Sequence, residues 1–277
     1  MRLIGRPKIG LALGGGGARG LAHIGVIKTL EKHKIPIDYI AGTSAGALIG
    51  GIYAATKDIK QIEEIAETLT YKDFIQTFSD ISLKSGLLRG EKVKNFIGRY
   101  AGEKTFKKLK IPFNAVTTDL VSGKTFAIKR GDIATAIRAS CSLPGIFHPV
   151  KRGKKLLIDG GATEQVPVKT VKNMGAERII AVNLNSRHFQ PKIKDKKNNE
   201  ISTISTLIST MNIMIYHVAE RSVKGAHIVI NPDVPDIPLT KVVNGTEYIK
   251  IGEKACEDQI DEIKWISKKS FLFLPVS

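Results

Sequence analysis

Short apolar stretches and stretches of helical periodicity alternate along the first part of the chain. Residues 8–13 form an apolar run that leads into four consecutive glycines, and residues 37–41 form a second such run. Between them, apolar residues recur at every fourth position, which predicts a helix over about 21–34. A further helix is expected from about Ala45. Strands and helices that alternate with short connections are typical of a parallel sheet covered by helices.

The same pattern predicts further elements along the rest of the chain. Strands are expected at residues 112–118, 124–129, 156–158, 178–184 and 226–230. Helices are expected at residues 58–69, 91–100, 132–140, 201–223 and 244–266. Residues 71–90 are less regular, and residues 187–200, which hold five Lys or Arg residues, are predicted to form a mobile loop. No internal repeat or change of composition divides the chain, so we expect one α/β domain with helical additions.

One of the predicted helices, residues 201–223, is apolar almost all round. Its large apolar residues are Ile204, Leu207, Ile208, Met211, Ile213, Met214 and Ile215. Such a helix is buried in a core, lines an apolar cavity or lies on a membrane. Burial in the core is the interpretation that we favour.

The charge of the chain restricts its partners. The 277 residues carry a net charge of +17, which favours contact with anionic partners. However, Lys outnumbers Arg by 32 to 11 and aromatic residues make up only 6%, whereas nucleic-acid binding relies on Arg contacts and aromatic stacking. We therefore expect no nucleic-acid partner. Two explanations of the charge stay open, a solvated Lys-rich surface and attraction to an anionic membrane.

The cysteine content and the N-terminus predict a cytoplasmic location. The chain has two cysteines, Cys141 and Cys256, as is usual in a reducing compartment. The apolar residues 9–13 after the basic N-terminus are too few for a signal peptide before the glycines interrupt them. No apolar run approaches the roughly 20 residues that a membrane-spanning helix needs. The expected location is cytoplasmic, and the positive charge allows peripheral contact with an anionic membrane.

A G-x-S-x-G motif, Gly42-Thr43-Ser44-Ala45-Gly46, lies between the second predicted strand and the helix that follows it. A nucleophilic serine at such a sharp turn has a strained backbone, and its neighbours must be small for the backbones to approach. The start of the helix also supplies a positive dipole end for developing negative charge. We therefore predict that Ser44 is a nucleophile between the required glycines Gly42 and Gly46. A glycine-rich turn with a capping serine is the alternative.

Residues 15–20, Gly-Gly-Gly-Ala-Arg-Gly, form a glycine-rich loop at the start of the first helix. Consecutive glycines there expose backbone N–H groups, which is what an oxyanion hole requires, and we favour this role. The segment also matches the G-x-G-x-x-G pattern of dinucleotide-binding proteins, so a nucleotide site and a tight structural turn stay open. Two observations count against a nucleotide. The acidic residue about 20 positions later, Asp38, begins the second strand instead of ending it, and that strand ends in the serine motif.

A third short motif, Asp159-Gly160-Gly161, follows a short predicted strand and by itself indicates only a turn. The glycine-rich loop, the G-x-S-x-G motif and a later Asp-Gly-Gly, in this order, resemble the patatin-like phospholipases. Residues 139–144, Ala-Ser-Cys-Ser-Leu-Pro, are similar to the small-residue helix end and proline that precede the Asp motif in that family. The resemblance covers about residues 8–185 well and the remainder loosely.

The resemblance implies a three-layer α/β/α fold with a mostly parallel central sheet. It implies a single domain over residues 1–277, with the motif-bearing core at about 8–185 and a helical elaboration at about 201–266. The activity it implies is hydrolysis of lipid acyl esters by a Ser-Asp dyad, without a cofactor or a metal. Gly14 departs from the resemblance, since many members carry a polar or acidic residue at that position.

Matched by position, the resemblance implies that Ser44 is the nucleophile and Asp159 the base. An aspartate is a weak base at its ordinary pKa near 4, so a sheltered site must raise its pKa. The other matched positions are the oxyanion residues Gly15, Gly16 and Gly17, Arg19 that holds their loop, and the motif glycines Gly42, Gly46, Gly160 and Gly161.

Other residues offer alternatives to this dyad. His23 lies near the glycine-rich loop and is a candidate base, but it shares a helix face with Ile27 and Leu30, so a packed structural histidine is expected. His148 as base and Cys141 as nucleophile are weaker candidates. The predicted function is a serine esterase acting on lipid acyl esters. A non-catalytic regulator or scaffold on the same fold and a dinucleotide-binding protein are the alternatives.

Overall fold

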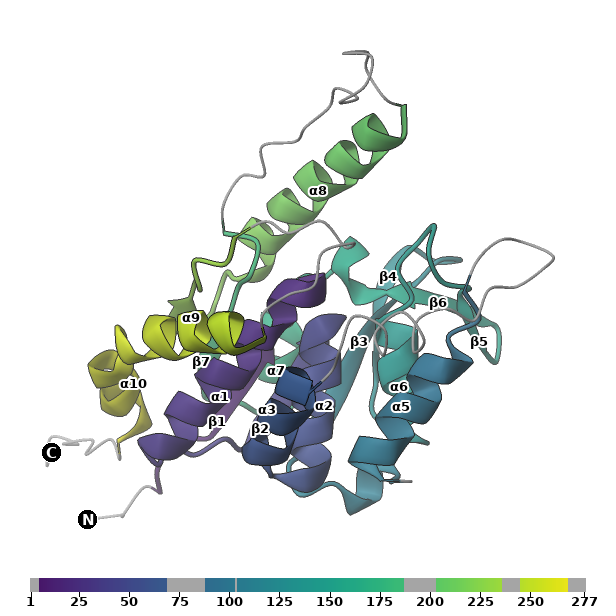
Figure 1. The fold of residues 1–277 in the computed structure, drawn as a ribbon. Coiled ribbons are helices and arrows are strands. Elements are labelled where there is room, and N and C mark those ends of the chain that lie inside the picture. The colour runs from purple at the N-terminus through teal and green to yellow at the C-terminus, as the bar shows by residue number, and fades with distance from the viewer. Residues whose placement is uncertain (1–4, 69–87, 103, 187–202, 236–244, 269–277) are drawn as a thin grey trace, which may run out of the picture.

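The computed structural model of the protein describes five segments of the chain, residues 5–68, 88–102, 104–186, 203–235 and 245–268. The first, third and fourth of these segments supply a central sheet of eight strands (Figure 1). Its strands are β1 (Ile9–Leu13), β2 (Tyr39–Thr43), β3 (Phe113–Asp119), β4 (Lys124–Ile128), β5 (Val150–Arg152), β6 (Lys155–Asp159), β7 (Arg178–Val182) and β8 (Ile228–Ile230). They follow the order β5-β6-β3-β2-β1-β7-β8, and β4 pairs with β3 outside this path.

Parallel pairing dominates the middle of the sheet. Strands β3, β2, β1, β7 and β8 run parallel to one another, whereas β4 and β6 run antiparallel to β3, and β5 runs antiparallel to β6. The parallel strands therefore all end at one end of the sheet, the carboxyl end, and all begin at the other, the amino end. The predicted α/β fold with a mostly parallel central sheet is confirmed.

Helices cover both faces of the sheet. They are α1 (Ala22–Lys32), α2 (Ala45–Thr56), α3 (Ile59–Thr68), α5 (Glu91–Ala101), α6 (Ile133–Ser140), α7 (Val168–Asn173), α8 (Thr203–Ser222), α9 (Gly245–Glu257) and α10 (Ile260–Ser267). Short 3-10 helices are η1 (Gly17–Leu21), η2 (Phe106–Lys108) and η3 (Gly160–Ala162). Because side chains alternate along β1, Leu11 and Leu13 belong to a large core with α1, α2 and α9, while Ala12 faces α7 and the end of α8. Three layers result.

Most elements lie where the pattern places them, with local differences. Strand β2 begins at Tyr39, two residues later than expected, so that it leads directly into Ser44. The expected C-terminal helix is broken into α9 and α10 around Asp258. Strand β5 and helix α7 have no prediction because three and six residues are too few for a periodic signal. Most of the irregular stretch 71–90 lies outside the described residues. The expected mobile loop at 187–200 lies wholly outside them.

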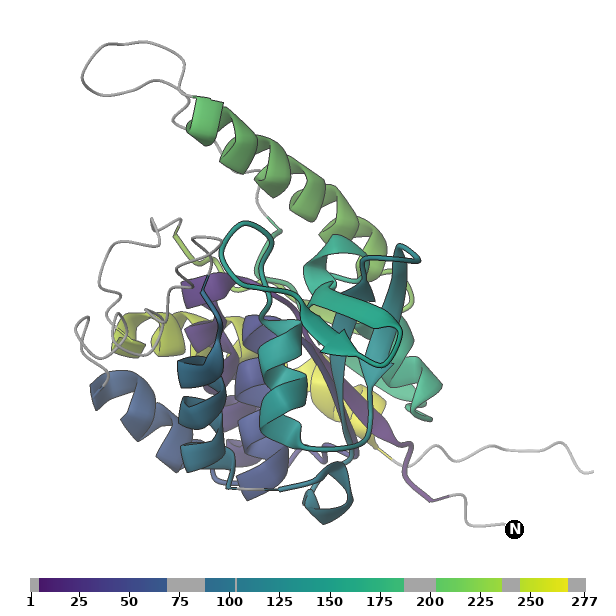
Figure 2. The same cartoon turned by 90° about the vertical axis from the view of Figure 1, so that its right-hand side faces the viewer.

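Helix α8 corrects the expectation of core burial for residues 201–223. Figures 1 and 2 show the helix leaving the body of the protein at the carboxyl end of the sheet. Its C-terminal part is buried at Ala219, but Leu207 and Met214 are each 62% exposed. An all-round apolar pattern does not distinguish a core helix from one that leaves the core. Among the described residues, no helix has the length and apolar character needed to cross a membrane.

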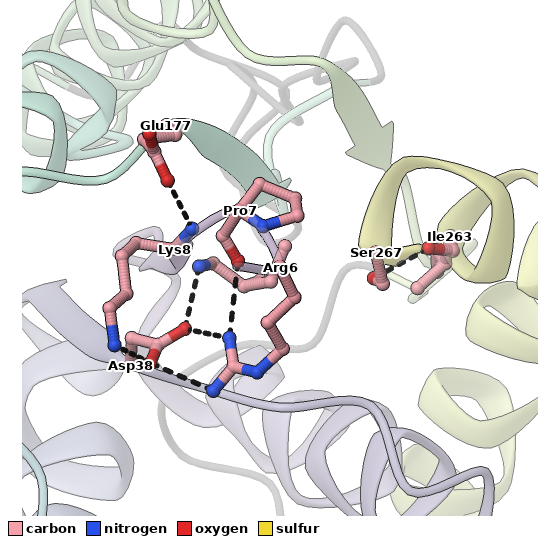
Figure 3. Close-up of polar contacts among 8 residues, drawn as sticks. Arg6, Pro7, Lys8, Asp38, Glu177, Ile263 and Ser267 are labelled. Carbon is pink, nitrogen blue, oxygen red and sulfur yellow. Dashed lines mark hydrogen bonds and ion pairs between the residues drawn. The ribbon is translucent and has the colours of Figure 1, made fainter. Parts of the chain in front are cut away.

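A cluster of charged side chains holds the amino end of the sheet together (Figure 3). The carboxylate of Asp38 accepts hydrogen bonds from Arg6 at 2.5 and 2.9 Å, from Lys8 Nζ at 3.1 Å and from the Ile9 amide at 2.8 Å. Glu177 accepts the Lys8 amide at 2.6 Å. Burial acts to raise the pKa of Asp38, but the hydrogen bonds outweigh it and keep the pKa below its ordinary value. Asp38 thus fastens β1 to the start of β2.

Candidate active site

Ser44 follows the last residue of β2 and precedes α2, as the G-x-S-x-G motif predicts. Its backbone has φ 53° and ψ −121°, a strained conformation for a residue that is not glycine. The flanking glycines are required by contact. A Cβ atom at Gly42 would lie 2.4 Å from the Gly46 carbonyl oxygen, and one at Gly46 would lie 2.1 Å from the Leu13 carbonyl oxygen. The strand-to-helix turn is therefore a tightly packed elbow that presents Ser44.

Two side chains fix the backbone of this elbow. The amide of Ser44 donates to the hydroxyl oxygen of Ser140 at 3.0 Å, and that hydroxyl donates to the Val116 carbonyl at 2.6 Å. The hydroxyl of Thr43 donates to the Glu164 carbonyl at 2.8 Å. The elbow is thus tied to β3 and to the segment that follows Asp159.

Asp159 is the last residue of β6, which lies along the same edge of β3 as β2 does. Strand β4 pairs with the other edge of β3, so on the shared edge Val116 pairs with Thr43 and the next residue, Thr117, pairs with Asp159. Because β6 runs antiparallel to β3 and Ser44 directly follows Thr43, the ends of β2 and β6 meet and bring Ser44 and Asp159 together at the carboxyl end. The amide of Asp159 donates to the Ser142 carbonyl at 2.9 Å, which fixes the backbone of the aspartate.

Asp159 is buried, with only 4% of the residue exposed. Burial raises its pKa to about 6, although hydrogen bonds from the Gly161 amide and the Ser44 side chain act in the opposite direction. Oδ1 accepts the Gly161 amide at 2.8 Å, whereas Oδ2 has no hydrogen bond of normal geometry. Ser44 therefore lies close enough to influence Asp159, yet the two are not joined by a well-formed bond. A loose contact of this kind is common in free enzymes and tightens when substrate binds.

The glycines after Asp159 leave room for close neighbours. A Cβ atom at Gly160 would lie 2.5 Å from the Val116 carbonyl oxygen, where the chain passes over β3. One at Gly161 would lie 2.3 Å from the side-chain oxygen of Gln165. The Asp-Gly-Gly motif thus brings the aspartate, β3 and Gln165 together.

The glycine-rich loop lies next to Ser44, since a Cβ atom at Gly15 would be 3.2 Å from the Ser44 Cβ. However, the amide of Gly15 donates to the Gln165 carbonyl at 3.0 Å. The structure corrects the expectation for Gly15, because an amide engaged in this way has no hydrogen to offer an oxyanion. The amides of Gly16 and Gly17 stand just before and at the first residue of η1, where N–H groups have no partner within the helix.

Three polar side chains hold this loop in place. The carbonyl of Gly15 accepts the side-chain amides of Gln165 at 3.1 Å and of Asn185 at 2.8 Å. Arg19 donates to the side-chain oxygen of Asn185 at 2.7 Å, and its Nε donates to the Gly16 carbonyl at 3.4 Å. Arg19, which lies in η1, therefore binds both the loop and Asn185.

Four supporting residues have no sequence-based prediction: Ser140, Ser142, Gln165 and Asn185. Ser140 and Ser142 lie within the small-residue segment 139–144 that carries part of the resemblance, but the pattern of this segment does not indicate what its serines contact. Gln165 and Asn185 follow the third motif and β7, and polar residues at strand ends are the signal that points to them.

The residues considered as alternatives have other surroundings. His23 is completely buried, its Nε2 donates to the Gly14 carbonyl at 2.7 Å, and burial lowers its pKa to about 4. It is thus a neutral packed histidine, as expected. Burial raises the pKa of Cys141, which opposes formation of a thiolate. Asp38 lies at the amino end of the sheet, far from the glycine-rich loop that a dinucleotide would occupy.

Comparisons of the sequence with known proteins find a family and several relatives. Residues 11–172 match the sequence model of the family described as patatin-like phospholipase. An uncharacterised NTE family protein of Mycobacterium tuberculosis is 34% identical over 216 residues, which are 78% of this chain and 60% of that protein. Lysophospholipase NTE1 of Debaryomyces hansenii is 34% identical over 188 residues, 67% of this chain and 12% of that protein. The chain thus spans about 60% or less of the length of these relatives.

A solved structure shares the fold. VipD from Legionella pneumophila superimposes with a TM-score of 0.55 at 14% identity, covering 92% of this chain and 67% of the VipD chain. At that identity the likeness concerns the fold alone. The family match spans more than half of the residues and contains all three motifs, and this chain therefore belongs to the patatin-like phospholipase family.

Proposed function

We propose that this chain hydrolyses lipid acyl esters, with Ser44 as the nucleophile and Asp159 as the general base. One observation carries the proposal. At the carboxyl end of the sheet, a serine with a strained backbone lies beside a buried aspartate that has one carboxyl oxygen without a hydrogen bond. An unpartnered buried oxygen costs stability, and such a cost is typical of a functional group.

The raised pKa of Asp159 supports its role as base. A carboxylate with a pKa of about 6 takes up a proton more readily than an ordinary aspartate, and at neutral pH it is still mostly ionised. Its unpartnered Oδ2 is the oxygen that would accept the proton of Ser44.

The reaction then has two halves. Ser44 Oγ attacks the carbonyl carbon of the ester while its proton passes to Asp159. The tetrahedral intermediate expels the alcohol, which takes the proton from Asp159, and the acyl group stays on Ser44. In the second half Asp159 takes a proton from water, the hydroxyl adds to the acyl carbon, and Ser44 leaves with the proton. Fatty acid and free enzyme result.

The amides of Gly16 and Gly17 are the donors that we propose for the oxyanion. A donor of this kind contributes roughly 3 kcal/mol to stabilising the intermediate. Gly15 acts differently, since its amide and carbonyl are both bound to Gln165 and anchor the loop. Arg19 and Asn185 hold the same loop from its other end.

A lipid substrate is supported by family membership and by a relative whose name is lysophospholipase. Because this chain spans only part of that relative, phospholipid and lysophospholipid are both candidates. The substrate class proposed here is therefore a long-chain acyl ester, presented at or near a membrane.

The test is hydrolysis of a chromogenic fatty-acyl ester and of a lysophospholipid by purified protein. We expect Ser44→Ala and Asp159→Asn each to lower kcat by roughly a thousandfold or more. Matched controls are Ser222→Ala and Asp258→Asn, which remove the same groups far from the site and should keep wild-type rates. Melting temperatures at or above the wild-type value would exclude unfolding as the cause.

Two results would overturn the proposal. Full activity in Ser44→Ala would remove the nucleophile, and wild-type protein that cleaves neither substrate would favour a regulator or scaffold. An active Asp159→Asn beside an inactive but folded His23→Gln would assign the base to His23.

A further inference from the structure

Helix α8 exposes apolar side chains without a partner among the described residues. From Thr203 to Ala219 the sequence holds no Lys, Arg, Asp or Glu. Leu207 and Met214 are each 62% exposed, and with the half-buried Met211 they stand at spacings of four and three on one helix face. Exposed apolar stripes of this kind mark surfaces that bind a partner. We call these three residues the α8 stripe.

The helix carries this stripe past the candidate active site. The helix packs on η3, the turn that directly follows Asp159. From there α8 continues beyond the carboxyl end of the sheet, as both views show (Figures 1 and 2). A surface that binds the stripe would therefore lie on the same side of the protein as Ser44.

Two hairpin turns project at the same end, one between β3 and β4 and the other between β5 and β6. Because Leu157 pairs with Asp119, strand β6 begins beyond the end of β3 and runs back toward Asp159. The turn between β3 and β4 exposes Leu120 by 53% and Val121 by 74%. Apolar side chains thus stand at a second place at the carboxyl end.

The same two hairpins carry exposed lysines. Lys124, Lys151 and Lys154 are exposed on the two hairpins. The sequence has no Asp or Glu in residues 120–131 or 145–158. We call Leu120, Val121 and these three lysines the basic tips.

We propose that the α8 stripe and the basic tips together seat this chain on an anionic phospholipid surface, with the Ser44 site facing the lipid. The inference rests on the proposed function, for which it names the surface that presents the substrate. Apolar side chains flanked by lysines match a layer of acyl chains beneath anionic headgroups. A second copy of the chain is a poorer occupant, because in a two-fold contact the same lysines would approach each other.

The test is co-sedimentation with vesicles of phosphatidylcholine alone or with phosphatidylglycerol added, using the inactive Ser44→Ala protein so that lipid stays intact. We expect stronger binding to the anionic vesicles, and weaker binding as salt rises. Leu207→Glu with Met214→Glu should weaken binding at least about tenfold. Lys124→Glu, Lys151→Glu and Lys154→Glu together should weaken binding to anionic vesicles by about a hundredfold.

Matched controls change the same properties at the amino end. Trp265 of α10 is 75% exposed, and Trp265→Glu should leave vesicle binding unchanged. Lys57 directly follows α2, and Lys107 and Lys108 lie in η2, shortly before the start of β3; all three are exposed. Their replacement by Glu gives the same net charge as the tip variant. With Ser44 restored, all these variants should hydrolyse a water-soluble short-chain ester at wild-type rates.

The outcomes separate the inference from the proposed function. If the protein binds neither kind of vesicle, or if the control variants lose binding as much as the stripe and tip variants, the inference is overturned while ester hydrolysis stands. If light scattering shows dimers that the stripe variant abolishes without a change in vesicle binding, the stripe is an interface between copies and the inference fails as well. Loss of short-chain hydrolysis in Ser44→Ala is independent of all these results.

Discussion

Asp38 and Asp159 stand at opposite ends of the central sheet, one just before β2 and the other at the end of β6. Asp38 accepts hydrogen bonds from Arg6, Lys8 and the Ile9 amide, and its pKa is lowered. Asp159 accepts one amide on Oδ1, has no normal partner on Oδ2, and burial raises its pKa to about 6.

The difference between the two carboxyl groups shows what each end of the sheet is built for. At the amino end both oxygens of the Asp38 carboxylate accept hydrogen bonds, and the carboxylate joins β1 to β2. At the carboxyl end it shelters a carboxyl group without satisfying it, beside a serine with a strained backbone. Partial satisfaction costs stability and leaves the group available for chemistry.

The largest expected effect concerns the pH dependence of turnover. If Asp159 is the base, it must be ionised, so kcat should fall about tenfold for each pH unit below its pKa of about 6. Between pH 7 and pH 4 the loss should reach about a hundredfold. Steady-state hydrolysis of a water-soluble ester, with folding followed by circular dichroism, measures it. Asp38→Asn should leave this profile unchanged. A wild-type rate that stays level down to pH 4.5 would contradict the assignment of Asp159.

The second effect concerns stability at the carboxyl end. The folded pKa of Asp159, about 6, exceeds the unfolded value of about 4, so the folded state holds its proton more firmly. The protonated side chain makes its full contribution to the stability of the folded state below about pH 4, and this contribution is lost as the pH rises through 6. At pH 8 the buried charge should cost about 2–3 kcal/mol. Asp159→Asn should therefore unfold at higher denaturant concentration than wild type at pH 8 and at nearly the same concentration at pH 4. If the midpoints of Asp159→Asn and wild type differed equally at pH 8 and pH 4, the raised pKa of Asp159 would be contradicted.

The sequence predicts the residues whose backbone requirements are local. Ser44 and its two glycines leave a recognisable five-residue pattern, because only small residues fit a sharp strand-to-helix turn. Asp159 carries a weaker signal, since Asp-Gly-Gly alone is a common turn, and only its order after the other motifs gives it meaning. These residues therefore emerge from the chain without knowledge of strand pairing.

The remaining parts of the site depend on which strands are neighbours. Ser140 supports Ser44 only because α6 places its hydroxyl between the Ser44 amide and the Val116 carbonyl of β3. The Gly15 amide is engaged only because Gln165 lies opposite it, 150 residues away in sequence. No periodicity within one segment contains such pairings. The exposure of α8 is not predicted for a similar reason, because its apolar pattern does not say where the core ends.

A smaller effect should follow from Ser140→Ala at the carboxyl end. The change removes the hydroxyl that accepts the Ser44 amide and leaves that amide and the Val116 carbonyl without their partner. We expect kcat to fall roughly tenfold with little change in KM, because the nucleophile would be less well positioned. Ser142→Ala is the matched control, since only the backbone carbonyl of Ser142 contacts Asp159 and it survives the change. Equal losses in both variants, measured by steady-state kinetics, would make Ser140 a general packing residue.

The smallest expected effect lies at the amino end, in Asp38→Asn. The folded pKa of Asp38 lies below its unfolded value, so the carboxylate adds stability above about pH 4, and this stability is lost as the pH falls through the folded pKa. Arg6 and Lys8 are 39% and 54% exposed, so water screens both ion pairs, and the loss at pH 7 should be only about 1 kcal/mol. Denaturant unfolding should show this loss at pH 7 and less of it at low pH, while kcat stays at the wild-type value, since the residue lies at the far end of the sheet. A fall in kcat without unfolding would mean that the two ends of the sheet are coupled.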